Sequence, residues 1–413
     1  MEFLYLLAVE AYGLGIRIAA LFHPKAKDWV EGRRNWSRKL KEQLQDKPAR
    51  RIWFHCPSLG EFEQGRPVLE QIRKQYPDHC IVLTFFSPSG YNARKNEKLA
   101  DVVTYMPLDG KIRSKKFLRM VNPELVFFVK YDFWYFYGKQ MYRQKTPFFC
   151  VSANFRPGQI FFTAWGRFFR KILTRYTHIF VQDQSSLELL YKNAIPSVTV
   201  SGDTRFDRVL ENKERAADFP LLQQFCEKGV VMVAGSTWPA DDKLLADLLR
   251  TNDQLKLVLV PHEISEPGLQ RVEQQFFGKT IRYSVASEND MKKARVVIID
   301  TIGMLSLLYR FGKYSYVGGG FGRGIHNILE AAVYGKPVFF GPNFKKFREA
   351  RDLKAMGCGI VVKKSSDLKA EFSKLEANAD EYTKLSLKSQ KYIEDRKGAT
   401  EILMNFLRMN YPS

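Results

Sequence analysis

Residues 314–342, "YSYVGGGFGRGIHNILEAAVYGKPVFFGP", decide the fold that the sequence predicts. An apolar run ends at Val317, three glycines follow, and a segment with helical spacing begins near Ile325. A buried strand, a tight glycine turn and a helix form the repeating unit of a parallel α/β sheet. The bare backbone of the turn lets a ligand approach closely, and the helix start directs free N–H groups towards an anion.

The predicted helix has a polar front formed by His326, Asn327 and Glu330, and an apolar back. Glu330 lies one turn into the helix, where a carboxylate can hold ribose hydroxyls. Two other interpretations remain open. The first is a capped turn with a purely structural role. The second is a dinucleotide-binding G-x-G-x-x-G fingerprint, although that motif normally opens the first βαβ unit of a chain and this one lies late.

Working outward, short apolar runs alternate with helical segments in two series. The first series comprises 51–56, 80–86, 102–106, 124–130, 147–153, 178–182 and 198–202, and the second comprises 229–235, 255–261, 294–300, 314–319 and 336–341. Continuous apolar strands separated by helices indicate parallel sheets that are covered on both faces. The polar stretch 204–220 separates the series, which predicts two doubly wound α/β domains with a cleft between them. We expect an N-terminal domain at 25–206, a C-terminal domain at 207–381, and a helix within 382–413 that crosses back to the first domain.

Ligands of such sheets bind at the carboxyl ends of the strands, so polar residues there are site candidates. In "HCPSLGE" (55–61), a strand ends at Cys56 and a helix begins with Ser58, Gly60 and Glu61. Glu61 then lies at the mouth of the cleft, where a carboxylate can act as a general base. The alternative is structural, because Ser58-x-x-Glu61 also fits a capping box.

Other strand ends carry further candidates. They are Lys130, Asp132, Asn154 and Arg156 in the first series, and Ser236, Thr237 and His262 in the second. An acid beside Trp134, such as Asp132, suits a sugar, and a hydroxyl at a helix start suits a phosphate. Helix capping is the alternative for each acid or hydroxyl, and a structural role is the alternative for the lone histidine.

The first 24 residues predict a membrane-associated helix. They are mostly apolar, and Glu2, Glu10 and Arg17 fall within about 80° of one helical face. Basic residues and two tryptophans follow in the segment 25–41, a pattern that favours contact with anionic headgroups on the cytoplasmic side. The alternative is a helix that packs on the protein's own core.

Composition narrows the remaining choices. The 413 residues carry a formal net charge of +21, which favours anionic partners such as nucleic acid, phosphates or an acidic membrane surface. The five cysteines form no C-x-x-C pair, so neither a disulfide framework nor a zinc site is indicated, and a reducing compartment is expected. The chain has no D-x-D pair, no histidine cluster and no Walker A loop. We therefore expect chemistry without a metal or cofactor.

Several motifs taken in order resemble the Kdo (3-deoxy-D-manno-octulosonic acid) transferases of lipid A synthesis. They are "KDWVEGRRNW", "SLGE", "DFW", "SANFR", "GDTRFD", "AGST", "DTIGMLSLLY" and "VGGGFGRGIHNILEAAVYGKPVFFGP". The resemblance covers nearly the whole chain. It implies the two-domain GT-B glycosyltransferase fold and an inverting, metal-independent transfer of Kdo from CMP-Kdo to a lipid A precursor. It also implies a location at the cytoplasmic face of the inner membrane, with membrane lipids as partners.

The resemblance assigns roles residue by residue. Glu61 matches the catalytic carboxylate, and Asp132 matches an acid of the Glu-x-Glu-x-Trp motif. The segments that line the CMP site contain Ser236, Thr237, Met304, Gly319, Gly320, His326, Asn327 and Glu330. Lys130 stands where the motif has its first acid, and His262 stands where the family often has arginine, so a permanently charged phosphate ligand is missing.

Three other function classes are compatible with parts of the pattern. The first is another GT-B enzyme, such as a UDP-sugar transferase or epimerase. The second is a nucleic-acid binder, which the charge suggests but which no recognisable motif supports, so nucleic acid is not expected as a partner. The third is a membrane-bound scaffold without activity, and Glu61 argues against it.

Overall fold

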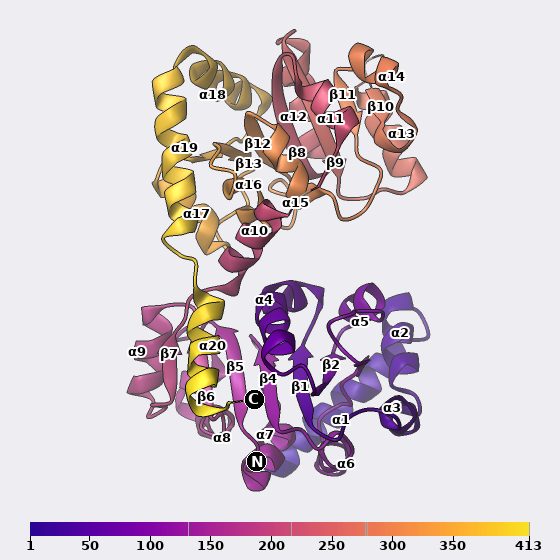
Figure 1. The fold of residues 1–413 in the computed structure, drawn as a ribbon, viewed down its shortest axis with the longest axis vertical. Coiled ribbons are helices and arrows are strands. Elements are labelled where there is room, and N and C mark those ends of the chain that lie inside the picture. Colours follow the sequence, from indigo (N-terminus) through magenta and orange to yellow (C-terminus); the bar gives the residue numbers. More distant parts are fainter. Residues whose placement is uncertain (131, 216, 277, 279, 413) are drawn as a thin grey trace. The chain divides into compact units, whose positions relative to one another are not determined.

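The computed structural model describes residues 1–130, 132–215, 217–276, 278 and 280–412. The chain divides into two compact units, which are described separately. Residues 1–208 and 397–413 form the first unit, and residues 209–396 form the second (Figure 1).

The first unit contains seven strands and most of the N-terminal helices. The strands are β1 (Arg51–Cys56), β2 (Cys80–Phe85), β3 (Val102–Tyr105), β4 (Leu125–Val129), β5 (Phe148–Ala153), β6 (His178–Val181) and β7 (Val198–Val200). The helices are α1 (Glu2–Ala19), α2 (Pro24–Arg33), α3 (Trp36–Leu44), α4 (Leu59–Gln75), α5 (Pro88–Arg94), α6 (Lys111–Val121), α7 (Tyr135–Gln144), α8 (Arg167–Leu173), α9 (Gln184–Lys192) and α20 (Ala399–Asn410), with 3-10 turns at Ile160–Phe162 and Ala164–Gly166.

The seven strands form one parallel sheet in the order β3-β2-β1-β4-β5-β6-β7. The strands are almost wholly buried, because helices cover both faces of the sheet. The chain runs outward from β1 through β2 to β3, and then returns to place β4 on the other side of β1. β1 and β4 therefore form the topological switch point, where the connections leave in opposite directions and open a crevice.

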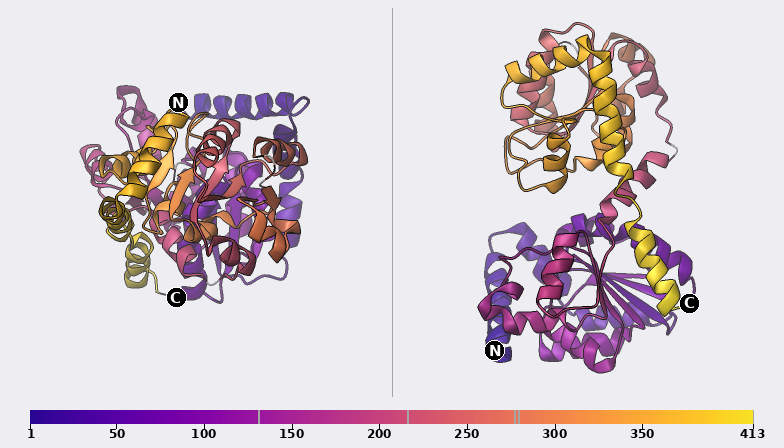
Figure 2. Two further views of the ribbon diagram at one scale, coloured as in Figure 1. Left: turned by 90° about the horizontal axis from the view of Figure 1, so that it is seen from above. Right: turned by 90° about the vertical axis from the view of Figure 1, so that its left-hand side faces the viewer.

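Helices α1 and α20 lie on opposite sides of this sheet (Figure 2, right). Tyr5 of α1 packs against the core beneath α3, α6, α7 and α8. Leu403, Met404 and Leu407 of α20 are buried in the other core, together with residues of α4. The C-terminal helix thus completes the core of the first unit.

The second unit repeats the architecture. Its strands are β8 (Val230–Thr237), β9 (Leu255–Pro261), β10 (Thr280–Arg282), β11 (Val296–Ile298), β12 (Tyr314–Val317), β13 (Val338–Phe340) and β14 (Gly359–Val361). Its helices are α11 (Pro220–Cys226), α12 (Pro239–Arg250), α13 (Glu266–Gln275), α14 (Glu288–Lys293), α15 (Leu305–Leu308), α16 (Leu329–Ala332), α17 (Arg348–Ala355), α18 (Ser365–Ala377) and α19 (Ala379–Glu394), with 3-10 turns at Tyr283–Val285 and Tyr309–Phe311. Helix α10 (Thr204–Glu214) crosses the boundary between the units.

The second sheet is also parallel, in the order β10-β11-β9-β8-β12-β13-β14, and its switch point lies between β8 and β12. Two doubly wound parallel α/β domains, as the sequence predicts, are therefore confirmed. The short strands β10 and β14 have no counterpart in the predicted series. The strand β10 (TIR) contains an arginine and is partly exposed, and β14 (GIV) begins with a glycine, so neither gives a distinct apolar run.

The helix predicted to begin near Ile325 is wrong in its start and its length. The observed helix α16 is a single turn that begins at Leu329, so His326 and Asn327 lie in the loop before it. Gly324 has φ of 137°, outside the helical region, and the Asn327 side chain accepts a hydrogen bond from the Leu329 N–H. The glycine-rich backbone therefore stays in a turn for longer than the apolar spacing suggests.

The N-terminal helix α1 presents its polar stripe to the protein. Glu2 contacts Lys139 at 2.5 Å, and Glu10 pairs with Arg113. The Tyr5 hydroxyl donates to Asp109 at 2.8 Å. In the part of the chain that the structure describes, no helix is long and apolar enough to cross a membrane.

Candidate active site

The switch point of the first sheet brings the predicted residues of the first domain together. The Ser58–Glu61 segment follows β1, and Lys130 and Asp132 follow β4, the neighbouring strand. Helix α4 packs closely on these two strands, because a Cβ atom at Gly65 would lie 2.6 Å from Val129 and 3.0 Å from Phe54. This close approach fixes the first turn of α4, and with it Glu61, above the crevice between β1 and β4.

Glu61 has two polar neighbours at the start of α4. Ser58 caps the helix by accepting a hydrogen bond from the Gly60 N–H at 3.2 Å, and its hydroxyl donates to the Glu61 carboxylate. The Lys130 ammonium lies 3.9 Å from the other carboxylate oxygen. Among the described hydrogen bonds, Glu61 accepts this hydroxyl and not the backbone N–H of Ser58, so the reciprocal capping box is incomplete. The carboxylate is therefore held in place by groups that leave it partly accessible.

Lys130 has a backbone conformation that non-glycine residues rarely adopt. Its φ is +66°, and Ser152 in β5 and Ser236 in β8 are also left-handed, at +56° and +53°. A non-glycine residue in this region costs roughly 1–2 kcal/mol. Strained backbone conformations are common at functional sites, where the surrounding structure fixes the direction of a side chain. Each of these three residues lies at or near the carboxyl end of a strand.

A buried chain of hydrogen bonds reaches Asp132 from beneath. The Trp53 indole N–H donates to the Thr84 hydroxyl oxygen at 2.8 Å, and this oxygen lies 2.7 Å from His55 Nδ1. His55 Nε2 lies 2.5 Å from Asp132 Oδ2. We refer to Trp53, Thr84, His55 and Asp132 as the β1–β2 relay, because the first three occupy neighbouring positions on these two strands.

Counting donors and acceptors assigns the hydrogens of the relay. Tryptophan can only donate, so the Thr84 oxygen accepts from Trp53, and the Asp132 carboxylate can only accept, so His55 donates to it from Nε2. In the neutral imidazole Nδ1 is then the acceptor of the Thr84 hydroxyl. Trp53, His55 and Thr84 are wholly buried, so an unpaired group among them would be costly. The relay therefore fixes both the histidine tautomer and the orientation of the Asp132 carboxylate.

The other two candidates of the first domain have different surroundings. The Asn154 amide donates to Asp183 at 3.0 Å and to Gln182 at 3.4 Å, which ties the end of β5 to the start of α9. Arg156 is exposed, and its backbone N–H donates to Gln159. These contacts give Asn154 a structural function and leave the Arg156 side chain in solvent.

In the second unit, the glycine turn after β12 faces the end of β8. Gly319 has φ of 88°, and a Cβ atom there would lie 2.6 Å from the Gly324 carbonyl oxygen. The Gly319 N–H donates to Asp241 at 2.9 Å, and the Tyr316 hydroxyl donates to the same carboxylate at 2.7 Å. Burial raises the pKa of Asp241, and these hydrogen bonds oppose the shift. Asp241 thus anchors the turn from α12.

Three rings stack beside this turn. His262 lies between Trp238 and His326, with ring centroids 4.6 and 4.5 Å away. The Trp238 indole N–H is 3.3 Å from His326 Nε2, so this nitrogen acts as the acceptor. Burial, with a smaller contribution from His262, lowers the pKa of His326 to about 4. The three stacked rings therefore form an aromatic cluster next to the glycine turn.

The remaining candidates of the second domain lie around the same switch point. Ser236 and Thr237 end β8, and Gly320 contacts the backbone of Gly341 closely. The Asn327 amide donates to Glu330 at 3.0 Å. Met304 precedes α15, where its sulfur accepts the Thr301 hydroxyl at 2.7 Å.

Four residues with clear structural contributions are absent from the sequence-based candidates. They are His55, Thr84, Trp238 and Asp241. A histidine inside the apolar run 51–56 was a visible signal, because a buried histidine requires partners. Asp241 and Thr84 carried no comparable signal, since their partners come from distant segments.

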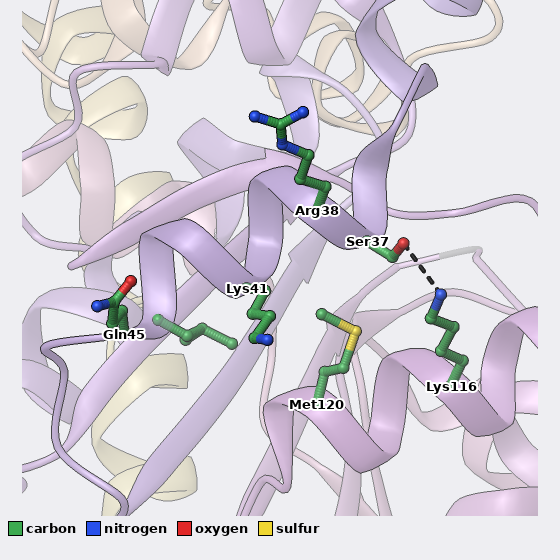
Figure 3. Close-up of a pocket in the computed structure, with 7 residues that line it drawn as sticks. Ser37, Arg38, Lys41, Gln45, Lys116 and Met120 are labelled. Atoms are coloured by element: carbon green, nitrogen blue, oxygen red, sulfur yellow. Dashed lines mark hydrogen bonds between the residues drawn. The ribbon is translucent and has the colours of Figure 1, made fainter.

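Two cavities of the first unit lie among its N-terminal helices rather than at these switch points. One, of about 590 Å³, lies between α3 and α6, where Lys41 points towards Met120 (Figure 3). The other, of about 570 Å³, lies between α1, α2 and the connection from β3 to α6. Within the described ranges, no group of three or more histidine, cysteine or acidic side chains could hold a metal ion.

Comparisons with known proteins agree with the geometry. Residues 33–208 match the family described as 3-Deoxy-D-manno-octulosonic-acid transferase (kdotransferase). The 3-deoxy-D-manno-octulosonic acid transferase of Aquifex aeolicus is 27% identical over 370 residues, which cover 86% of this chain and 94% of that protein. The protein of the same name from Rickettsia prowazekii is 25% identical over 407 residues, which cover 93% of this chain and 85% of that protein.

Solved structures with little sequence similarity share the fold. The UDP-GlcNAc 2-epimerase of Neisseria meningitidis aligns with a TM-score of 0.62 at 15% identity, over 87% of this chain and all of that one. This likeness confirms the fold of the GT-B class, with two parallel-sheet domains. Taken together, the matched region and the relatives along most of its length show that the chain is similar to the 3-deoxy-D-manno-octulosonic acid transferases, which are glycosyltransferases.

Proposed function

We propose that this protein transfers Kdo from CMP-Kdo to a hydroxyl of a lipid A precursor, with inversion at the anomeric carbon and Glu61 as the general base. The observation that carries the proposal is the position of Glu61. Its carboxylate lies at the switch point of the first sheet, between the Ser58 hydroxyl and the Lys130 ammonium. The similarity to 3-deoxy-D-manno-octulosonic acid transferases supports Kdo as the sugar that is transferred.

The proposed step balances as a single displacement. The acceptor hydroxyl loses its proton to Glu61, and its oxygen forms a bond to the anomeric carbon of Kdo. The bond from that carbon to the phosphate oxygen breaks, and its electron pair leaves with CMP. The Ser58 hydroxyl and Lys130 hold the carboxylate in place, and the relay holds Asp132 after the end of the neighbouring strand β4, where it orients acceptor or Kdo.

The donor would bind at the switch point of the second sheet. The Gly319–Gly320 turn offers a bare backbone to the CMP phosphate, and Ser236 and Thr237 lie at the neighbouring strand end. Glu330 would hold the ribose hydroxyls. His262 replaces the arginine that is frequent in the family, so hydroxyl groups and backbone N–H groups other than that of Gly319, which is donated to Asp241, carry more of the phosphate recognition here. This arrangement requires no metal or other cofactor.

The test is Kdo transfer from freshly generated CMP-Kdo to a tetraacylated lipid A precursor, with EDTA present. Glu61→Gln keeps an oxygen that accepts the Ser58 hydroxyl but removes the base, so we expect a folded protein with at least a hundredfold lower rate. Glu42→Gln makes the same change on α3 and should behave as the wild type. Equal rates for all three proteins would refute the role of Glu61.

Nucleotide preference separates this proposal from a UDP-sugar enzyme with the same fold. We expect CMP, and not UDP, to raise the melting temperature of the wild-type protein. Protection by UDP alone would favour the alternative. Random oligonucleotides should not bind at physiological ionic strength, because the proposed partners do not include nucleic acid.

We also propose that α1 lies in the plane of the inner membrane's cytoplasmic surface. Its outward side chains are large and apolar, and they include Phe3, Leu7, Leu14 and Ile18, which are 49–69% exposed. Because its acidic residues are paired with the protein, the outward face meets lipid without burying a carboxylate. Replacing Leu7 and Leu14 together by glutamate should abolish flotation with lipid vesicles. Unchanged flotation would exclude this placement.

A further inference from the structure

The cavity between α1, α2 and the β3–α6 connection has an unusual charge balance. Five basic side chains and one carboxylate line its volume of about 570 Å³. Two of the basic side chains are already committed to the wall. Arg113 donates to the Leu108 carbonyl at 2.8 Å and pairs with Glu10, and Arg33 donates to three backbone carbonyl groups.

Arg33 is a half-buried cation held by neutral groups. Its guanidinium donates to the carbonyl oxygens of Trp29, Phe86 and Met106 at 3.2, 2.6 and 3.0 Å, and it lies 3.8 Å from the Trp29 ring. No carboxylate in the described part of the chain forms an ion pair with it. Burial lowers the pKa of Arg33 to about 9. A buried charge without a counterion is costly, and an anion bound in the adjoining cavity would reduce that cost.

Two more guanidinium groups lie at the mouth of the cavity. Arg17 comes from α1 and Arg34 from the residue after α2, and both are exposed. Among the residues that the structure describes, neither guanidinium has a hydrogen-bond or ion-pair partner. Guanidinium groups bind phosphate oxygens through paired hydrogen bonds. Arg17 and Arg34 line the same cavity, so together they suit a bound phosphate group better than they suit a carboxylate of the protein.

The surroundings of the mouth favour a ligand with an apolar tail. Leu21 lines the cavity and is 76% exposed, and Phe22 beside it is 85% exposed. Both continue the apolar outward face of α1. A soluble phosphate would leave this surface in water, whereas a lipid would cover it.

The cavity between α3 and α6 (Figure 3) serves as a comparison within the same unit. Its one arginine has a partner, since Arg38 pairs with Glu42 at 2.8 Å, and of its two lysines Lys116 donates to Ser37 at 3.0 Å. Its lining is mostly apolar and includes Leu44 and Met120. Charge alone therefore does not distinguish the two cavities, but unpartnered guanidinium groups beside the apolar face of α1 do.

We propose that the cavity between α1 and α2 binds the phosphate headgroup of an acidic membrane phospholipid, with Arg17 and Arg34 as its ligands and the acyl chains along the outward face of α1. This site is separate from the acceptor and donor sites. It rests on the proposed membrane placement of α1 and not on Kdo transfer, so it is tested without donor or acceptor.

The experiment compares binding of the full chain to vesicles of phosphatidylcholine alone and of phosphatidylcholine mixed with phosphatidylglycerol. Arg17→Gln with Arg34→Gln should weaken binding to the acidic vesicles by roughly tenfold or more, because two charge-assisted contacts are lost. Arg38→Gln with Lys41→Gln removes the same charge at the other cavity and should have a much smaller effect. Equal losses for both double variants, or no loss for the first, would overturn the proposal.

A second arm separates a lipid from free phosphate. A short-chain phosphatidylglycerol should raise the melting temperature of the wild type and not of the Arg17/Arg34 variant. Inorganic phosphate at the same concentration should give no such shift. Equal stabilisation by inorganic phosphate would assign the site to a soluble anion and contradict the proposal. Kdo transfer to a detergent-solubilised acceptor should be unchanged in this variant, which keeps this test independent of the catalytic one.

Discussion

Replacing Thr84 by valine tests the β1–β2 relay most directly. The two side chains are close in shape, so the main change is the loss of one hydroxyl group. The Trp53 N–H then has no acceptor, and His55 Nδ1 has no donor. Each unpaired buried group costs about 1–3 kcal/mol, so the free energy of unfolding should fall by about 2–6 kcal/mol.

The effect on the site should exceed simple destabilisation. Without Thr84, His55 Nδ1 has no hydrogen-bond partner, so only the contact with Asp132 still favours the hydrogen on Nε2 and the imidazole is held from one side alone. We expect kcat to fall roughly tenfold because Asp132 loses its orientation, while KM for the donor stays close to that of the wild type. Nitrogen-15 NMR of labelled histidine reads the tautomer itself, which a purely structural role would not change.

The matched control is Thr104→Val on β3, where the side chain is also buried. In the described part of the chain the Thr104 hydroxyl has no side-chain hydrogen bond, so this variant should melt close to the wild type. If both valine variants melt alike and His55 keeps its hydrogen on Nε2, the donor–acceptor assignment of the relay is wrong.

Three further predictions concern the glycine turn, the ring stack and α1. Gly319→Ala should abolish the rise in melting temperature that CMP causes, because the new Cβ would lie 2.6 Å from a carbonyl oxygen and the residue has φ of 88°. In the control Gly322→Ala the nearest atom lies 3.7 Å from the new Cβ, so CMP should still raise the melting temperature. His326 should titrate near pH 4 by NMR. Because its pKa is lower in the folded state, the unfolded chain takes up the proton first as the pH falls, so the free energy of unfolding decreases from about pH 6.5 towards pH 4. A His326→Gln variant whose free energy of unfolding changes with pH as in the wild type would contradict this. Tyr5→Phe removes a donor to Asp109 and the acceptor of a backbone N–H, so urea unfolding should show a loss of about 1–3 kcal/mol, and no loss would mean that α1 is not held by this hydroxyl.

The main strands were predictable because parallel strands buried on both faces must be continuously apolar. The strand β1 has the predicted bounds, and so does β9. The helix near Ile325 was not predictable from spacing, because apolar periodicity does not register the backbone freedom of Gly322 and Gly324. The local sequence pattern does not show which segments, distant in the sequence, a residue will contact.

The candidate site was likewise predictable from the sequence only in part. Glu61 and Lys130 could be placed from sequence, since strand ends of one parallel sheet share an edge. The partners of Asp132 could not, because Thr84 contacts His55 only through the register between β1 and β2. For α1, the polar stripe was visible, but its direction was not. The stripe faces the protein, so packing on the core and an exposed apolar face coexist.

The return of α20 to the first unit has a consequence for biosynthesis. The second unit is one continuous segment, residues 209–396, inserted into a first unit whose core is completed by the last residues of the chain. Until Leu403, Met404 and Leu407 have emerged from the ribosome, the sheet face they cover stays open. The later unit can therefore fold to completion before the earlier one, which reverses the usual order of vectorial folding. A polypeptide that ends at residue 208 would carry that uncovered face permanently and should aggregate, whereas the 209–396 segment should be recovered as a folded domain.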